Sequence, residues 1–336
     1  MAEEIVARDL HKSFIVRDKM FGPRKQKTAV NRLTLSIPRG RVTGLLGLNG
    51  AGKTTTIKMI STLLRPTSGT VTVDGLDSVA NARAVRGRLN LIAGGERMVY
   101  ARMTGRENLH YFGRLYGVST QLLRPRADEL LDTVGLAEAA DTLVERYSRG
   151  MTQRLAIARG LINDPAYLLL DEPTLGLDAP IARDLRRVIA KLVTEGKGIL
   201  LTSHYLTEVE ELCQHVYVIA RGSHLVEGSP AVLTASAGLR RTVEVVVPRP
   251  DETIVGAASE FGERVGAPVT YLQRDDGSLV VSLSHTDDIA GPLVTAIVAA
   301  GGAVAGLTIN NPSLEGAILA LADATEPSPV RGGKTE

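Results

Sequence analysis

The chain has 336 residues, of which 44% are hydrophobic and 23% are charged, and its formal net charge is +2. This length predicts one large domain and a smaller one. The nearly neutral charge excludes a protein that binds nucleic acid through bulk positive charge, and the single cysteine, Cys213, excludes an internal disulfide and suits a reducing cytosol. Residues 1–10 carry acids and no long apolar run, so we do not expect a signal peptide.

The N-terminal two thirds of the chain alternate strand patterns with helical patterns. Short apolar runs predict strands at 5–7, 33–37, 42–46, 71–73, 167–170, 198–202 and 216–220. Helix-forming segments predict helices at 55–64 and 181–194. Between them, the region from about 98 to 160 has a helical pattern and contains two amphipathic segments, 108–116 and 128–134. The basic segment 17–27, which contains Gly22 and Pro23, is expected to be a loop. Strands that alternate with helices predict a parallel sheet covered on both faces.

The last third of the chain has a different order of elements. Its patterns predict strands at 241–247, 270–273, 279–284 and 303–309, and helices at 253–264, 287–300 and 313–321. The order βαββαβ is that of a small α+β, ferredoxin-like domain. Residues 293–309 are apolar, but Gly301, Gly302 and Gly306 favour a helix, a turn and a strand over a membrane span. We expect the proline- and glycine-containing tail to be disordered.

A complete phosphate-binding loop follows the apolar run at 42–46 and precedes a helix. Its residues are Gly47, Leu48, Asn49, Gly50, Ala51, Gly52, Lys53 and Thr54. The glycines let successive backbone N–H groups point at phosphate oxygens, and the helix that Lys53, Thr54 and Thr55 open adds its N-terminus to the anion site. Lys53 would reach the β- and γ-phosphates, and the Thr54 hydroxyl would ligate Mg²⁺. The sequence therefore predicts a nucleotide site.

Two acids, Asp171 and Glu172, end the apolar run at 167–170. Ligands of open α/β sheets bind at the carboxyl ends of the strands, so both carboxylates are expected there. Asp171 would hold Mg²⁺ opposite Thr54, either directly or through a water molecule bound to the metal. Glu172 would be the general base for the water that attacks the phosphate. The alternative for these acids alone is a strand end followed by a solvated turn.

Two further positions have polar groups at the ends of predicted elements. Ser148 and Gly150 open an Ala- and Leu-rich helix, where a hydroxyl and backbone N–H groups are available to an anion, although a simple helix cap is the alternative. His204 follows the apolar strand at 198–202. A single histidine in that place is structural more often than catalytic.

Taken together and in order, these motifs resemble those of the ATP-binding-cassette (ABC) transporter ATPases over residues 3–235. Residues 47–54 resemble Walker A, 167–172 Walker B, 147–151 the ABC signature and 177–178 the D-loop. The resemblance makes His204 the switch histidine and Phe14 the aromatic that stacks on adenine, where an ordinary core phenylalanine is the alternative. It implies ATP and Mg²⁺ as cofactors, with domains at 3–235 and 240–323 and a tail at 324–336. The implied fold is a P-loop NTPase with a parallel sheet core, an antiparallel N-terminal sheet and a helical subdomain.

The sequence departs from the family pattern in two places. Arg149 replaces the first glycine of the signature, while Ser148 and Gly150 remain. The Tyr-Ser-x-Gly-Met form of this signature is similar to that of the exporters of drugs and polyketides, including daunorubicin-resistance ATPases. The C-terminal domain also resembles the domain appended to drug-export ATPase subunits. The Q-loop glutamine would fall near Gly95, where none is present, and Glu96 is a candidate to take its place at Mg²⁺ or water.

The resemblance implies an ATPase subunit that forms a head-to-tail homodimer and drives export of a lipophilic compound. The pathway would lie in a separate membrane permease, docked on residues 94–116 at the cytoplasmic face of the cell membrane, with no nucleic-acid partner. An importer ATPase, a translation factor and a DNA-maintenance ATPase are the alternatives. Translation factors of this kind carry two cassettes, and DNA-maintenance ATPases interrupt theirs with a long coiled coil, and neither feature is present here.

Overall fold

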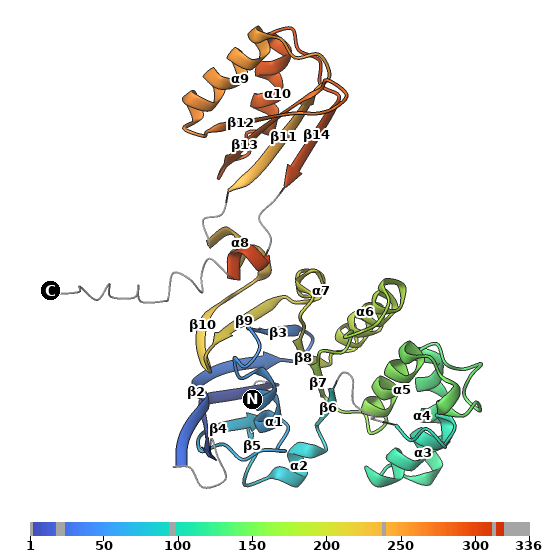
Figure 1. The fold of residues 1–336 in the computed structure, drawn as a ribbon. Helices are drawn as coiled ribbons and strands as arrows, with labels where there is room; N and C mark the ends of the chain where they lie inside the picture. The colour runs from blue at the N-terminus through green and yellow to red at the C-terminus, as the bar shows by residue number, and fades with distance from the viewer. Residues whose placement is uncertain (1–2, 18–23, 94–98, 237–239, 311–313, 319–336) are drawn as a thin grey trace, which may run out of the picture. The chain divides into compact units, whose positions relative to one another are not determined.

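The computed structural model describes residues 3–17, 24–93, 99–236, 240–310 and 314–318. The chain divides into two compact units, Met1–Pro230 and Ala231–Glu336 (Figure 1). The expected domain limits of 3–235 and 240–323 stay predictions, and the expected tail at 324–336 lies outside the described residues.

The centre of the first unit is a six-stranded sheet with the strand order β10-β9-β3-β8-β7-β6. Its members are β3 (Val42–Leu46), β6 (Leu89–Ala93), β7 (Tyr167–Asp171), β8 (Gly198–Thr202), β9 (His215–Ala220) and β10 (Ser223–Gly228). Neighbouring strands are parallel except for β10, which pairs antiparallel with β9. Every residue of β3 and β8 is buried, as expected for strands covered on both faces. The predicted parallel core is confirmed.

A second, antiparallel sheet has the order β2-β1-β4-β5. It consists of β1 (Glu4–Arg17), β2 (Arg24–Pro38), β4 (Ser68–Val73) and β5 (Leu76–Asp77). The expectation of a loop at 17–27 is wrong at its ends, because Arg17 and Arg24 are paired residues of a long β1–β2 ribbon. Residues 24–28 of this ribbon are exposed whichever way they point, so they lack the alternation by which a strand is recognised. Residues 18–23 lie outside the described residues.

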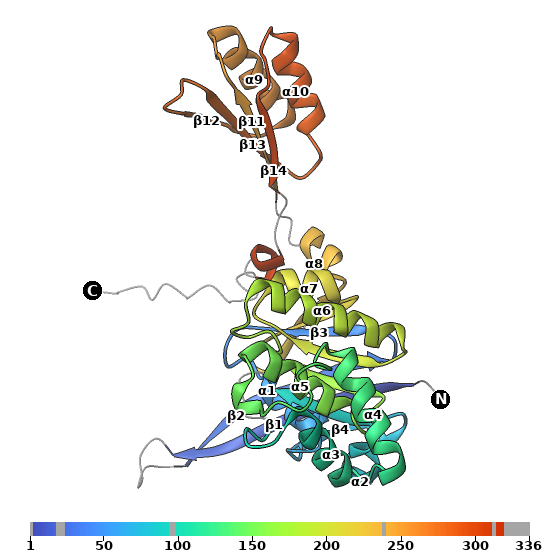
Figure 2. The same cartoon turned by 90° about the vertical axis from the view of Figure 1, so that its right-hand side faces the viewer.

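Helices cover both faces of the central sheet. Helix α1 (Lys53–Ile60) packs in the apolar core shared by the two sheets. Helices α5 (Arg149–Leu161) and α7 (Leu206–Leu212) lie on the other face, where Gly160 packs on Ile92 of β6 and Val209 on Gly44 of β3. The predicted helical subdomain is formed by α5 together with α3 (Gly105–Leu115) and α4 (Thr120–Thr133) (Figure 2). The first unit also contains α2 (Ala82–Arg86) and α6 (Ala179–Thr194), and α8 (Pro230–Ser236) begins at the last residue of this unit.

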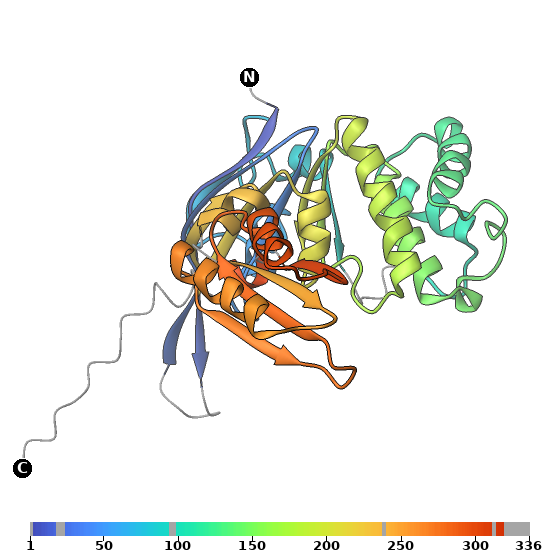
Figure 3. The same ribbon diagram turned by 90° about the horizontal axis from the view of Figure 1, so that it is seen from above.

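The second unit contains a four-stranded sheet of order β12-β13-β11-β14, antiparallel throughout. Its elements are β11 (Arg241–Val247), α9 (Glu252–Val265), β12 (Val269–Gln273), β13 (Leu279–His285), α10 (Ala290–Ala299) and β14 (Gly306–Asn310). Both helices contribute to one apolar core on the same face of the sheet (Figures 2 and 3). This order confirms the ferredoxin-like prediction.

The apolar run at 293–309 is divided between two elements. It comprises most of α10 and the start of β14, as the glycines at 301–306 indicated. Among the described residues, no helix combines the length and the apolar character needed to cross a bilayer. Of the last predicted helix, residues 314–318 are helical, and its other residues lie outside the described ranges.

A polar cluster ties the antiparallel sheet to the parallel one. Asp74, in the turn between β4 and β5, accepts a hydrogen bond from the Tyr167 hydroxyl at 2.5 Å. The same carboxylate pairs with Arg39 at 2.7 Å and with Arg88 at 3.0 Å. Burial raises the pKa of Asp74, but the hydrogen bonds from Tyr167 and Arg39 outweigh it and lower the pKa below its usual value. The charged form of Asp74 therefore stabilises the fold.

We expect Asp74→Asn to lower the free energy of unfolding by about 1.5–3 kcal/mol at neutral pH, the usual worth of hydrogen bonds to a charged group. Asparagine tolerates the left-handed backbone of this position, where φ is 47°, so the change removes charge without strain. Because the folded pKa is depressed, the stabilisation is present above the unfolded pKa of about 3.9 and is lost as the pH falls through the folded value.

Urea denaturation at pH 7 and at successively lower pH measures this effect. The difference between wild type and variant should narrow below about pH 4. Asp132→Asn, on the exposed side of α4, is the control and should change stability little at either pH. Equal effects of the two substitutions would contradict the role of Asp74.

Candidate nucleotide-binding site

The phosphate loop joins the buried strand β3 to helix α1. Gly52 caps the helix with φ at 107°, a conformation that side chains disfavour, and a Cβ there would come within 2.5 Å of the Ala29 carbonyl oxygen. The loop therefore needs glycine at this position and brings its backbone close to β2. The first N–H groups of α1 open toward the loop, which is the arrangement that binds phosphate at a helix start.

Lys53 is held against this loop. Its side chain is buried, and its ammonium donates hydrogen bonds to the carbonyl oxygens of Gly47 at 2.7 Å and Leu48 at 3.4 Å. Burial lowers the pKa of Lys53, while the carboxylates of Glu172 and Asp171 raise it. A cation stationed among backbone carbonyls gains better partners when phosphate oxygens arrive.

Asp171 connects the phosphate loop to the ends of two strands. Its Oδ2 accepts a hydrogen bond from the Thr54 hydroxyl at 3.2 Å, and its Oδ1 accepts one from the Thr202 hydroxyl at 2.6 Å. Hydroxyl and carboxylate oxygens are hard donors, and Mg²⁺ sites of nucleotide enzymes use one or two such groups beside waters and phosphate. The donor set at Thr54 and Asp171 therefore fits Mg²⁺.

Glu172 has a strained backbone and contacts the predicted histidine. Its φ is 54°, in the left-handed region that residues with a side chain seldom adopt, and its N–H is held by Thr202 through the carbonyl at 3.0 Å and the hydroxyl at 3.1 Å. Glu172 Oε1 lies 2.6 Å from His204 Nε2. Strain maintained by hydrogen bonds is a mark of functional sites, and here it turns the carboxylate toward His204.

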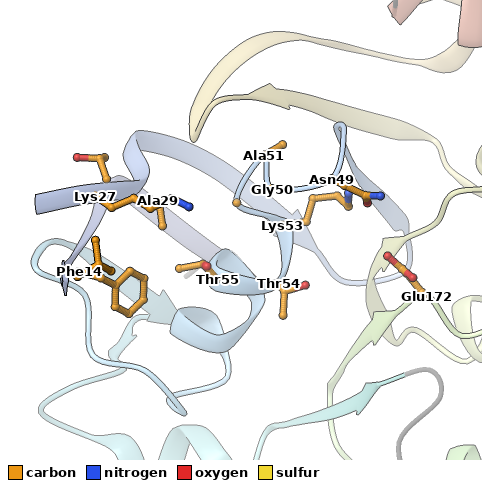
Figure 4. Close-up of a pocket in the computed structure, with 13 residues that line it drawn as sticks. Phe14, Lys27, Ala29, Asn49, Gly50, Ala51, Lys53, Thr54, Thr55 and Glu172 are labelled. Carbon is orange, nitrogen blue, oxygen red and sulfur yellow. The ribbon is translucent and has the colours of Figure 1, made fainter. Parts of the chain in front are cut away.

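These groups border a pocket of about 350 Å³. Figure 4 shows Phe14 at one end and Glu172 at the other, with Lys53 and Thr54 between them. The other lining residues are Val16, Lys27, Thr28, Ala29, Asn49, Gly50, Ala51, Gly52 and Thr55. The phosphate loop and the aromatic ring thus bound one cavity, as a nucleotide with a base and a phosphate chain requires.

Sequence reasoning missed the contribution of β2 to this pocket. Lys27 faces the cavity because it is the partner of Phe14 across the β1–β2 ribbon. The sequence predicts a basic loop around Lys27, and only the strand pairing reveals its place at the pocket. Lys12 is also near, with its ammonium 5.4 Å from the centre of the Phe14 ring.

The predicted signature residues do not line this pocket. Ser148 caps α5 and its hydroxyl accepts a hydrogen bond from the N–H of Met151 at 3.2 Å. Gly150 is packed so closely that a Cβ would lie 2.6 Å from the side chain of Ile181. Both are at the start of α5, so within one chain they are separate from the group formed by Lys53, Asp171 and Glu172.

Arg149, the departure from the signature, is directed toward the D-loop. Its guanidinium donates a hydrogen bond to the Gly176 carbonyl oxygen at 3.1 Å. Gly176 directly precedes the D-loop at 177–178, and Asp178 is the N-cap residue of α6. The other departure, at Gly95 and Glu96, lies outside the described residues, so the structure gives no position for either.

Comparison with known proteins agrees with this geometry. The family model described as ABC transporter matches residues 30–175. The chain is 36% identical to the daunorubicin resistance ATP-binding protein DrrA3 of Streptomyces coeruleorubidus over 90% of this chain and 93% of that protein. It is 43% identical to the ABC transporter ATP-binding protein NatA of Bacillus subtilis, over 61% of this chain and 84% of the relative. It is 38% identical to the Nod factor export ATP-binding protein I of Paraburkholderia xenovorans, over 69% of this chain and 76% of that protein.

Solved structures give the same result. An ATP-binding subunit of an ABC transporter has 26% identity and a TM-score of 0.59, and the match covers 70% of this chain and 93% of that one. A dimeric ATP-binding cassette in a post-hydrolysis state shares the fold, with a TM-score of 0.59 and 22% identity. The match covers 67% of this chain and 98% of that one. From its motifs, its fold and these relatives, the chain belongs to the ATP-binding proteins of the ABC transporter family.

Proposed function

We propose that this chain is the ATP-hydrolysing subunit of an exporter, and that it drives a lipophilic drug, antibiotic or similar compound through a separate membrane permease. One observation carries the ATPase assignment: the phosphate loop, Thr54 and Glu172 line the same pocket, and Thr54 and Glu172 are held from behind by Asp171 and His204. The direction of transport is supported by the relatives, which are named for daunorubicin resistance and for Nod factor export.

In this proposal the nucleotide occupies the pocket with its adenine on Phe14 and its phosphates along residues 47–55. The Lys53 ammonium leaves the loop carbonyls and binds the β- and γ-phosphate oxygens. Thr54 and Asp171 would hold Mg²⁺, which supplies neutralisation of phosphate charge when bound. Phe14 supports this orientation because its ring lies at the end of the pocket away from Glu172.

Glu172 acts as the general base in this reaction. Its carboxylate orients a water molecule toward the γ-phosphorus and accepts the proton that the water loses. His204 donates a hydrogen bond from Nε2 to Glu172 Oε1, which keeps the carboxylate directed at the water. Binding and orientation supply most of the rate in phosphoryl transfer, so the rigid Glu172 backbone serves the same purpose.

Two copies of the chain complete two sites. Ser148 and Gly150 are outside the pocket of their own chain but offer a hydroxyl and a backbone N–H at the start of α5. In a head-to-tail homodimer these groups reach the γ-phosphate bound to the partner, and each site draws on both chains. ATP would close the dimer and hydrolysis would reopen it.

We further propose that residues 3–235 form the ATPase domain, that 240–323 form the appended domain, and that the permease docks on residues 94–116. Docking there is supported by three exposed aromatic side chains, Tyr100, Tyr111 and Tyr116. Exposed tyrosines are enriched at protein interfaces. Through this contact the subunit would be held at the cytoplasmic face of the membrane.

The test replaces the chromosomal gene with a Lys53→Ala copy in its native host. The purified variant should lose MgATP hydrolysis, and cells should accumulate lipophilic dyes or antibiotics as the deletion strain does. Lys58→Ala, on the exposed side of the same helix, is the matched control and should behave as wild type. Normal efflux in the deletion strain together with failed uptake of a nutrient would indicate an importer instead.

A further inference from the structure

A buried acid lies behind the catalytic pair. Glu208 is on the first turn of α7, which begins directly after the loop that carries His204, and it is completely buried. Its Oε2 accepts a hydrogen bond from the Thr174 hydroxyl at 3.0 Å and another from the Ser203 hydroxyl at 2.5 Å. Both hydroxyl residues are buried as well. One carboxyl oxygen therefore joins the loop after β7 to the loop after β8.

These two loops carry the residues assigned to hydrolysis. Thr174 comes two residues after Glu172, and Ser203 comes one residue before His204. The Ser203 hydroxyl also accepts a hydrogen bond from the N–H of Tyr205 at 3.0 Å, so it braces the backbone on both sides of His204. Thr202 links the loops where they leave the sheet, and Glu208 links them again farther from it.

The chemistry of Glu208 is costly for a purely structural residue. Burial raises its pKa, although hydrogen bonds from Ser203 and Thr174 and the charge of Arg186 act in the opposite direction. Its second oxygen, Oε1, has no hydrogen-bond partner among the described residues. A buried polar atom without a partner destabilises a fold, and an apolar side chain of similar size would avoid that cost. A group retained at such a cost points to a positional role.

We propose that Glu208 is a positioning residue for ATP hydrolysis: it clamps Thr174 to Ser203 and thereby keeps His204 against Glu172. The clamp acts on the chemical step, because it touches neither the phosphate loop nor the aromatic end of the pocket. This proposal rests on the proposed ATPase function. It differs from that function in assigning part of the rate to a residue that does not contact the nucleotide.

Steady-state hydrolysis of MgATP by the full-length chain tests the clamp in three variants. Glu208→Leu fills the space of the glutamate but provides no hydrogen-bond acceptor. Thr174→Val keeps the shape of the threonine side chain and removes the hydroxyl that donates to Glu208. In both we expect kcat to fall about 10- to 100-fold, by analogy with the loss seen when the outer partner of a metal-binding side chain is removed. KM for ATP, and nucleotide binding measured directly, should stay within about twofold, since the phosphate loop is unaltered.

Glu208→Gln and Thr207→Val provide the comparison. Glutamine keeps an oxygen that both hydroxyls can reach, so Glu208→Gln should recover most of the wild-type kcat. Thr207→Val, on the exposed side of the same helix, should leave kcat and KM unchanged. If Glu208 only stabilised the fold, its substitution would lower the melting temperature but would not lower kcat selectively while KM stayed unchanged. If Glu208→Leu does not fold, Thr174→Val alone provides the test.

Two outcomes would overturn the role. Folded Glu208→Leu and Thr174→Val proteins with wild-type kcat would remove it, and so would equal losses of kcat and of ATP affinity. In either case the ATPase assignment would still hold, provided that the wild type hydrolyses ATP and the Lys53→Ala variant does not. Absence of any Lys53-dependent hydrolysis in the wild type would overturn the proposed function and the role of Glu208 together.

Discussion

Glu172→Gln is expected to bind MgATP with nearly unchanged affinity while its turnover falls by a factor on the order of 10²–10⁴, the usual contribution of a general base. The amide has the shape of the carboxylate but cannot accept the proton of the attacking water. Lys53, Thr54 and the loop glycines, which hold the phosphates in our proposal, are untouched. Glu195→Gln, at the exposed end of α6, is the control and should hydrolyse ATP as wild type does.

The same variant should accumulate as an ATP-bound dimer. Closure of the dimer requires only that both chains bind the nucleotide, whereas reopening requires the hydrolysis step that Glu172→Gln lacks. Size-exclusion chromatography with ATP and with ADP measures this directly, and the dimer should appear with ATP alone. Turnover close to wild type would remove Glu172 from the role of base, and a variant that traps ATP without dimerising would argue against composite sites.

Much of the candidate site could be predicted because it depends on local sequence patterns. The run at 42–46 ends in a glycine loop and the run at 167–170 ends in two acids, which is readable without knowing the fold. Parallel strands place such ends at one edge of a sheet, so the contact between Thr54 and Asp171, at 3.2 Å, follows from topology alone. The Glu172–His204 contact has the same origin, since their strands β7 and β8 are neighbours.

The parts that could not be predicted depend on pairing between distant segments. Lys27 lines the pocket only because β1 and β2 continue as a ribbon beyond the sheet, and residues exposed on both sides give no periodic signal. Glu208 is similar, because its partners Thr174 and Ser203 are separated in the sequence by the whole of α6 and β8. In a sequence, a glutamate on a short helix reads as a solvated residue.

Arg149 shows a third kind of limit. The sequence identifies it as a departure from the signature but does not indicate where its side chain points. The hydrogen bond to the Gly176 carbonyl directs the guanidinium to the residue before the D-loop of the same chain, and Ser148 stays exposed. A bulky side chain at 149 is therefore compatible with an anion site built from Ser148 and Gly150.

Ser148→Arg is the second change for which we expect a large effect, with steady-state hydrolysis lowered by a factor on the order of 10²–10³, as when a stabilising donor is removed from a reacting phosphate or oxyanion. ATP should still bind to the isolated subunit, because its own phosphate loop is intact. Closure should fail, since a long side chain would occupy the place of the partner's γ-phosphate. Ser119→Arg, at the exposed N-cap of α4, is the matched control for placing arginine at a helix start.

Mixing this variant with Lys53→Ala chains tests whether Ser148 acts on the partner's nucleotide. A heterodimer of the two has one site with both Lys53 and Ser148 intact, and a second site that lacks both. Hydrolysis of one ATP per heterodimer in a single-turnover experiment, absent from either variant alone, is the expected result. If heterodimers demonstrably form and no hydrolysis is recovered, each chain must use its own Ser148 or none, because only contact across the dimer can restore a complete site from two defective chains.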